Sequence, residues 1–138
     1  MKLRRILQRR GERGSSSVEM ALLLPVLLLV TVGIIDFSRI VSARNMLSNA
    51  AREATRYASV RSIDSEEPVT VDMVRNHVLN AIGPLDPQLL TINTSWTPTN
   101  APGNAVRVNL VYDFVPIAPI MPIALLELNA SSTMIISY

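Results

Sequence analysis

The feature that most constrains this chain is an uncharged apolar run from Met20 to Ile35, bounded by Glu19 and Asp36. As an α-helix, these 16 residues cover roughly 24 Å, which is less than the hydrocarbon core of a bilayer at about 30 Å. A helix that starts at Ser15 instead has 21 residues up to Ile35 and covers about 31 Å. The sequence therefore predicts a transmembrane segment over residues 15–36 that carries Glu19 in its first turns.

The segment before this run, residues 1–14, is strongly basic, with six positive charges and one negative charge. The whole chain has a net charge of +2, so the residues after Gly14 sum to −3 and the basic character belongs to this leader. Positive charge on the N-terminal flank predicts that this end stays in the cytoplasm while residues 37–138 are exported. The later arginines are scattered and few aromatic residues accompany them, so we expect no nucleic-acid partner.

Gly14, an acid five residues later and Pro25 inside the apolar run form a recognisable pattern. The segment GSSSVEMALLLP resembles the processing site of type IV prepilin-like proteins, whose dedicated peptidase cuts after the glycine at the cytoplasmic face of the membrane. The longer stretch from Gly14 to Val60, which includes the run NAAREATRYA, is similar to the N-terminal region of the TadE-like family. These are pilin-like proteins of the tight-adherence pilus system. Met20 departs from the pattern, because Phe or Tyr commonly follows the glutamate in that family.

This resemblance implies a function and a set of site residues. It implies cleavage by a prepilin peptidase between Gly14 and Ser15, and pairing of the new Ser15 α-amine with Glu19 of the same chain or a neighbour. The membrane-embedded positions would include Met20, Pro25, Gly33 and Ile35.

The expected protein is a minor pilin or pseudopilin that takes part in assembly of a tight-adherence (Flp-type IVb) pilus, a structure used in cell adhesion. Its partners would be the peptidase, other pilin-like subunits and the pilus machinery. It would cross the bacterial inner membrane once, with its C-terminal domain in the periplasm or in the pilus.

Two other interpretations of the apolar run remain open. A secretory signal peptide could be cut after Ala43, but Asp36 and Arg39 stand between the apolar run and that site. A single-span exported binding or sensory module with no role in a polymer is the main alternative function, and it predicts an uncut leader.

The composition argues against several kinds of chemistry. The chain has no cysteine, which excludes disulfides and thiolate chemistry, so an exported domain must be held by packing alone. His77 is the only histidine, so one chain cannot build a His-based triad or a multi-histidine metal site. We expect no catalytic, cofactor or metal residues, and we expect His77 to occupy an ordinary polar position on a helix.

The helical pattern continues beyond the membrane, because residues 37–61 contain no proline or glycine. Small and apolar side chains recur there at intervals of three and four residues, which predicts a narrow stripe that packs against neighbouring subunits, the chain's own sheet, or both. The members of this stripe are Ala43, Leu47, Ala50, Ala54 and Tyr57. Glu53 is expected to pair with Arg56 on the solvated side of the same helix.

The remaining residues, 62–138, predict a small α+β domain that begins after the acidic break SIDSEEP. A second helix is expected over Val69–Ile82 and is ended by Gly83-Pro84. Alternation predicts strands over residues 90–96, 106–114 and 127–138, with a hairpin loop TPTNAPGN and an extended loop Pro116–Ile123 between them. The expected fold is thus a long N-terminal transmembrane helix, then a small helix and a three-stranded antiparallel sheet.

Overall fold

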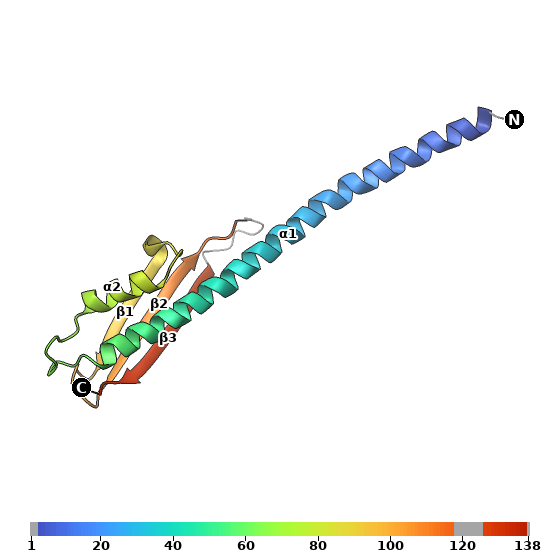
Figure 1. Ribbon diagram of the computed structural model, residues 1–138. Coiled ribbons are helices and arrows are strands. Elements are labelled where there is room, and N and C mark those ends of the chain that lie inside the picture. The colour runs from blue at the N-terminus through green and yellow to red at the C-terminus, as the bar shows by residue number, and fades with distance from the viewer. Residues whose placement is uncertain (1–2, 118–125, 138) are drawn as a thin grey trace. The chain divides into compact units, whose positions relative to one another are not determined.

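The computed structural model describes residues 3–117 and 126–137, with side chains from Ser16 onward. The chain divides into two compact units, Met1–Phe37 and Ser38–Tyr138, and one helix, α1 (Leu3–Ser59), contributes to both (Figure 1). All other helices and strands belong to the second unit. The predicted α+β class, with a long N-terminal helix, a short helix and a three-stranded antiparallel sheet, is confirmed.

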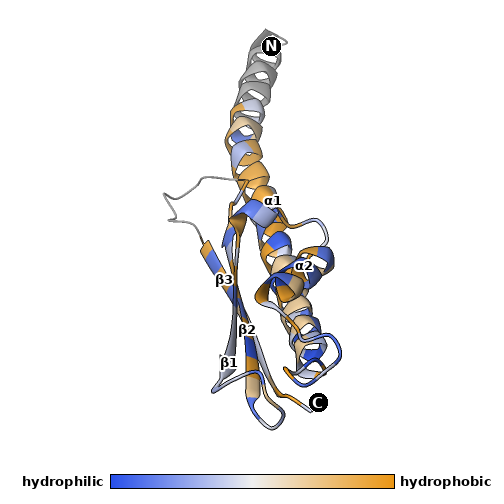
Figure 2. Cartoon of the chain, turned by 90° about the vertical axis from the view of Figure 1, so that its left-hand side faces the viewer, coloured by the Kyte–Doolittle hydropathy of each residue, from blue (hydrophilic) through white to orange (hydrophobic). Residues whose placement is uncertain are grey.

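In the first unit, the described part of α1 consists mostly of apolar residues, which are orange in Figure 2. From Val18 to Ile35 its large hydrophobic residues are exposed, except for the half-buried Val32, and the Thr31 hydroxyl donates to the Leu27 carbonyl at 2.8 Å. The stretch from Ser16 to Ser59 is long and apolar enough to cross a membrane, with a mean hydropathy of 2.6 in its most apolar window. A helix satisfies its own backbone groups, which is what a lipid environment requires of a spanning segment.

The second unit packs helices against one face of an antiparallel sheet (Figure 2). The strand order is β1-β2-β3, so β2 is central. Besides the end of α1, the unit contains α2 (Val71–Ala81), a 3₁₀ turn η1 (Pro87–Leu89), β1 (Leu90–Thr97), β2 (Ala105–Phe114) and β3 (Leu126–Ile135).

The alternation predicted for the central strand sets the core of the second unit. Side chains at every second position of β2 are buried, and Leu110 lies opposite Ile92 of β1 and Ala130 of β3. The intervening positions of the sheet are mostly polar and lie on its other face, as expected when one face of an antiparallel sheet is solvated. The buried members of β2 are Val106, Val108, Leu110, Tyr112 and Phe114.

The small-residue stripe of α1 contacts the chain's own sheet. Four of its five predicted members, Ala43, Leu47, Ala50 and Ala54, are at most 2% exposed and belong to the core of the second unit. The Thr55 hydroxyl donates to the Ser132 carbonyl of β3 at 3.4 Å, and the Ser137 amide donates to the Ser59 carbonyl at 3.0 Å. Small side chains allow this close approach, so the second of the two packing alternatives is the one observed.

Helix α2 is shorter than the predicted range of Val69–Ile82. Thr70 has extended backbone angles and accepts a hydrogen bond from the Met73 amide at 3.3 Å, so it caps the helix and excludes Val69 from it. At the other end, Gly83 has φ of +59°, a conformation that glycine adopts without steric cost. The turn chemistry therefore sets both boundaries.

The third strand begins at Leu126 and ends at Ile135, and is thus offset from the predicted range of 127–138. The next residue leaves the ladder, because the Ile136 amide donates to the Asn104 carbonyl at 2.8 Å. Tyr138 and most of the predicted loop Pro116–Ile123 lie outside the described residues.

Candidate functional site

The predicted processing segment lies in the first unit. Gly14 and Ser15 fall within α1, where only their backbone is described. Ser15 and Glu19 are four residues apart on this helix, which places them on the same face, one turn apart. The pairing between a new α-amine at Ser15 and the Glu19 carboxylate stays a prediction.

Glu19 is exposed, and no described residue forms an ion pair or hydrogen bond with it. Its neighbours along the helix are apolar and equally exposed, with Val18 at 62% and Met20 at 59%. An acid among apolar side chains at a membrane edge is costly unless it finds a counter-charge. No described residue provides a counter-charge for Glu19.

The other predicted membrane positions all lie on the uncovered surface of α1. Pro25 lies inside the helix, and Ile35 is 46% exposed near the end of the apolar run. A Cβ atom added at Gly33 would have no heavy atom within 4 Å of it. All of these positions are thus open to the surroundings of the helix.

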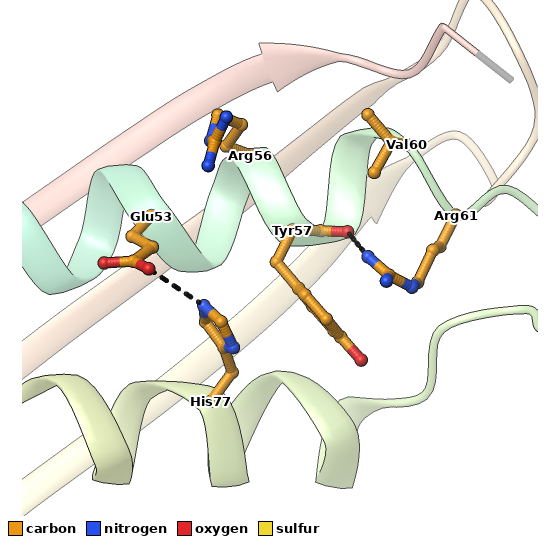
Figure 3. Close-up of a pocket in the computed structure, with 6 residues that line it drawn as sticks. All are labelled: Glu53, Arg56, Tyr57, Val60, Arg61 and His77. Carbon is orange, nitrogen blue, oxygen red and sulfur yellow. Dashed lines mark hydrogen bonds and ion pairs between the residues drawn. The ribbon is translucent and has the colours of Figure 1, made fainter.

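In the second unit, α1 and α2 form a hollow of about 300 Å³ on the surface (Figure 3). We call it the α1–α2 hollow. His77 reaches from α2 and stacks on the Tyr57 ring of α1, with centroids 4.5 Å apart and planes at 15°. The hollow is lined by Glu53, Arg56, Tyr57, Val60, Arg61 and His77.

The Glu53 carboxylate lies 3.6 Å from Nε2 of His77 and not, as predicted, against Arg56. Nε2 itself is buried, so Glu53 is the polar group that faces it. The i,i+3 spacing permitted a pair with Arg56, but α2 brings His77 to the other side of the same carboxylate. His77 is thus a contact between two helices, which is more than the polar surface position that the sequence indicated.

Two arginines border the same hollow. Arg61 lies over the Tyr57 ring at 4.0 Å and donates to the Tyr57 carbonyl at 3.1 Å, while Arg56 is exposed (Figure 3). No serine or threonine lines the hollow to be activated by His77, and the described residues contain no cluster of three metal-ligating side chains. The hollow thus carries one carboxylate, that of Glu53, and two arginines.

The described residues form one apolar helix, which is long and apolar enough to span a membrane, followed by an α+β unit. A family model described as TadE-like protein matches residues 14–56, about a third of the chain. The match confirms the predicted resemblance and begins at Gly14. No curated protein and no solved structure matched the chain.

Proposed function

We propose that this chain is a minor pilin or pseudopilin that takes part in assembly of a tight-adherence pilus after a prepilin peptidase removes residues 1–14. A TadE-like segment suggests a pilin-like protein associated with that pilus. The family match is the main support for this proposal, because it begins at Gly14 and includes Glu19 and the apolar run.

The remaining parts of the proposal follow from the anchor and its charges. A single apolar N-terminal helix could span a membrane, consistent with a membrane-anchored component of the pilus system. The basic leader favours a cytoplasmic N-terminus in the bacterial inner membrane and export of the second unit. In this proposal the exported unit acts by contacting other subunits and performs no catalysis.

The mature N-terminus tests the proposal directly. Mass spectrometry of the purified protein should find a chain that begins at Ser15, and Gly14→Arg should retain the leader, because a side chain at this position would obstruct the peptidase. Ser16→Ala is the matched control and should be cut normally. A wild-type chain that begins at Met1 would favour the single-span binding or sensory module, and one that begins at Arg44 would indicate a secretory signal peptide.

The orientation gives a second prediction. The leader's excess of positive charge should hold it in the cytoplasm and send residues 37–138 outward. Protease added to spheroplasts should therefore digest the second unit, and a reporter that is active only outside the cytoplasm should work when fused after Tyr138. Complete protection of the second unit in spheroplasts that are otherwise digested would contradict this orientation.

A further inference from the structure

The charges of the second unit are separated along the chain. Five of its seven arginines lie between Arg39 and Arg61, and its acids are concentrated after them. Arg52, Arg56 and Arg61 lie on the last turns of α1 and just beyond it, and no described carboxylate lies within 4.0 Å of their guanidinium groups. We call these three residues the arginine face.

The arginine face borders two depressions in the surface. One is the α1–α2 hollow, and the other, of about 380 Å³, lies between α1 and β3 and includes Arg52, Arg56 and Met134 in its lining. Arg56 lines both depressions, and so does Glu53, whose carboxylate lies 3.6 Å from Nε2 of His77. The surface thus offers unpaired positive charges next to space that an incoming segment can fill, together with the apolar side chain of Val60.

The loop that follows α1 has the complementary chemistry. Asp64, Glu66 and Glu67 are exposed and form no ion pair with a described residue, and Ile63 beside them is 63% exposed. We call residues 63–67 the acidic loop. It carries three negative charges and one large apolar side chain. The arginine face, by comparison, carries three positive charges and lies beside Val60.

Hydrogen bonds to Ser62 and Asn100, and one between the residues that flank it, connect the acidic loop to the rest of the second unit. Ser62 is fully buried, and its hydroxyl accepts from the Asp64 amide at 3.2 Å while its carbonyl accepts from the Ser65 hydroxyl at 2.7 Å. The Ile63 amide donates to the Asn100 carbonyl at 2.8 Å, and the Val69 amide to the Arg61 carbonyl at 3.3 Å. A segment already ordered in this way loses less conformational entropy when it binds.

We propose that the acidic loop of one copy docks on the arginine face of a second copy, with Ile63 of the first against Val60 of the second. No described carboxylate pairs with the three arginines and no described cation pairs with the three acids, and the two surfaces are opposite in sign, with Glu53 leaving the arginine face at a net charge of +2. This inference rests on the proposed function, because it names a contact between neighbouring pilin-like subunits.

The physical character of such a contact follows from its composition. Exposed charge pairs favour the correct partner and accelerate encounter more than they add affinity, and salt screens them. Anchoring both copies in one membrane raises their local concentration, so a weak contact of this kind can still be populated. Association should therefore be sensitive to salt and specific for the pairing of these two surfaces.

Disulfide cross-linking can test the pairing, because the chain has no cysteine of its own. Full-length Arg56→Cys carrying an affinity tag would be reconstituted into vesicles together with untagged Glu66→Cys and mildly oxidised. We expect a mixed disulfide dimer whose yield falls at high salt. Glu127→Cys is the matched control, since Glu127 is an exposed acid on β3, and its yield should be about tenfold lower if the contact is specific.

Reversing the charges on each surface tests the same contact without a disulfide bond between the copies. Arg52→Glu with Arg56→Glu, and separately Glu66→Arg with Glu67→Arg, should each weaken association of fluorescently labelled full-length protein in vesicles, because like charges then face each other. A mixture of the two variants should associate again. Circular dichroism would verify that both variants are folded.

Equal cross-linking of Glu66→Cys and Glu127→Cys, or no recovery in the mixture of folded variants, would overturn the proposed contact. Either result would leave the pilus function itself untouched, because neither assay measures cleavage or piliation. A chain that begins at Met1 but passes both assays would instead reject the pilus function and keep the self-association.

Discussion

Replacing Glu19 by Leu should abolish pilus assembly when the variant is the only copy, while the protein is still inserted and cut after Gly14. The substitution removes a charge from the edge of the apolar run and lengthens that run, so insertion should improve. What is lost is the carboxylate that pairs with the α-amine of Ser15, either in the same chain or in a neighbouring subunit. Electron microscopy of the cells counts the pili, and membrane fractionation with mass spectrometry measures insertion and cleavage.

Two variants make this result interpretable. Val18→Leu changes a neighbouring exposed side chain of the same helix without altering charge, and it should leave piliation normal. Glu19→Asp keeps the charge on a shorter side chain and should retain part of the activity. Normal piliation with Glu19→Leu would reject the pairing hypothesis and indicate that the helix serves as a passive anchor.

The anchor and the sheet could be predicted because each depends on a local pattern. The apolar run from Met20 to Ile35 is recognised by its lack of charge, and it reaches the thickness of a bilayer once the residues from Ser15 onward are included. Likewise, alternation over residues 106–114 indicates which side chains of β2 are buried, whereas the register that places Leu110 opposite Ile92 and Ala130 comes from the structure. Both are properties of short stretches of sequence.

The α1–α2 hollow could not be predicted, because it depends on how two helices pack. Helical periodicity placed Glu53 and Arg56 on one side of α1 but gave no information on where α2 would lie. Only the packed unit places His77 on Tyr57 and its Nε2 within 3.6 Å of Glu53.

The small-residue stripe illustrates the same limit. Its spacing predicted that one face of the exported helix is packed, but small residues suit a neighbouring subunit as well as a sheet of the same chain. The structure distinguishes the two, because Leu47 and Ala54 are completely buried inside the second unit. Tyr57, the last member, turns toward α2 and takes part in the α1–α2 hollow.

Leu47→Ala should lower the free energy of unfolding of the second unit by about 2–5 kcal/mol, because it removes a fully buried side chain and leaves a cavity between α1 and the sheet. This is a large part of the total for a domain of this size, which is about 5–15 kcal/mol. Urea unfolding of the full chain in detergent can be followed by the fluorescence of Trp96, the only tryptophan, which lies on β1 and packs against the core.

The matched control is Val41→Ala, six residues earlier on the same helix and 43% exposed, which should change the free energy of unfolding by about 0.5 kcal/mol or less. If the stripe existed to pack against neighbouring subunits, Leu47→Ala would resemble Val41→Ala in this assay and would impair assembly alone. We expect instead that Leu47→Ala lowers the free energy of unfolding and that piliation falls only as a consequence. A second substitution that restores stability elsewhere in the core should then also restore the pili.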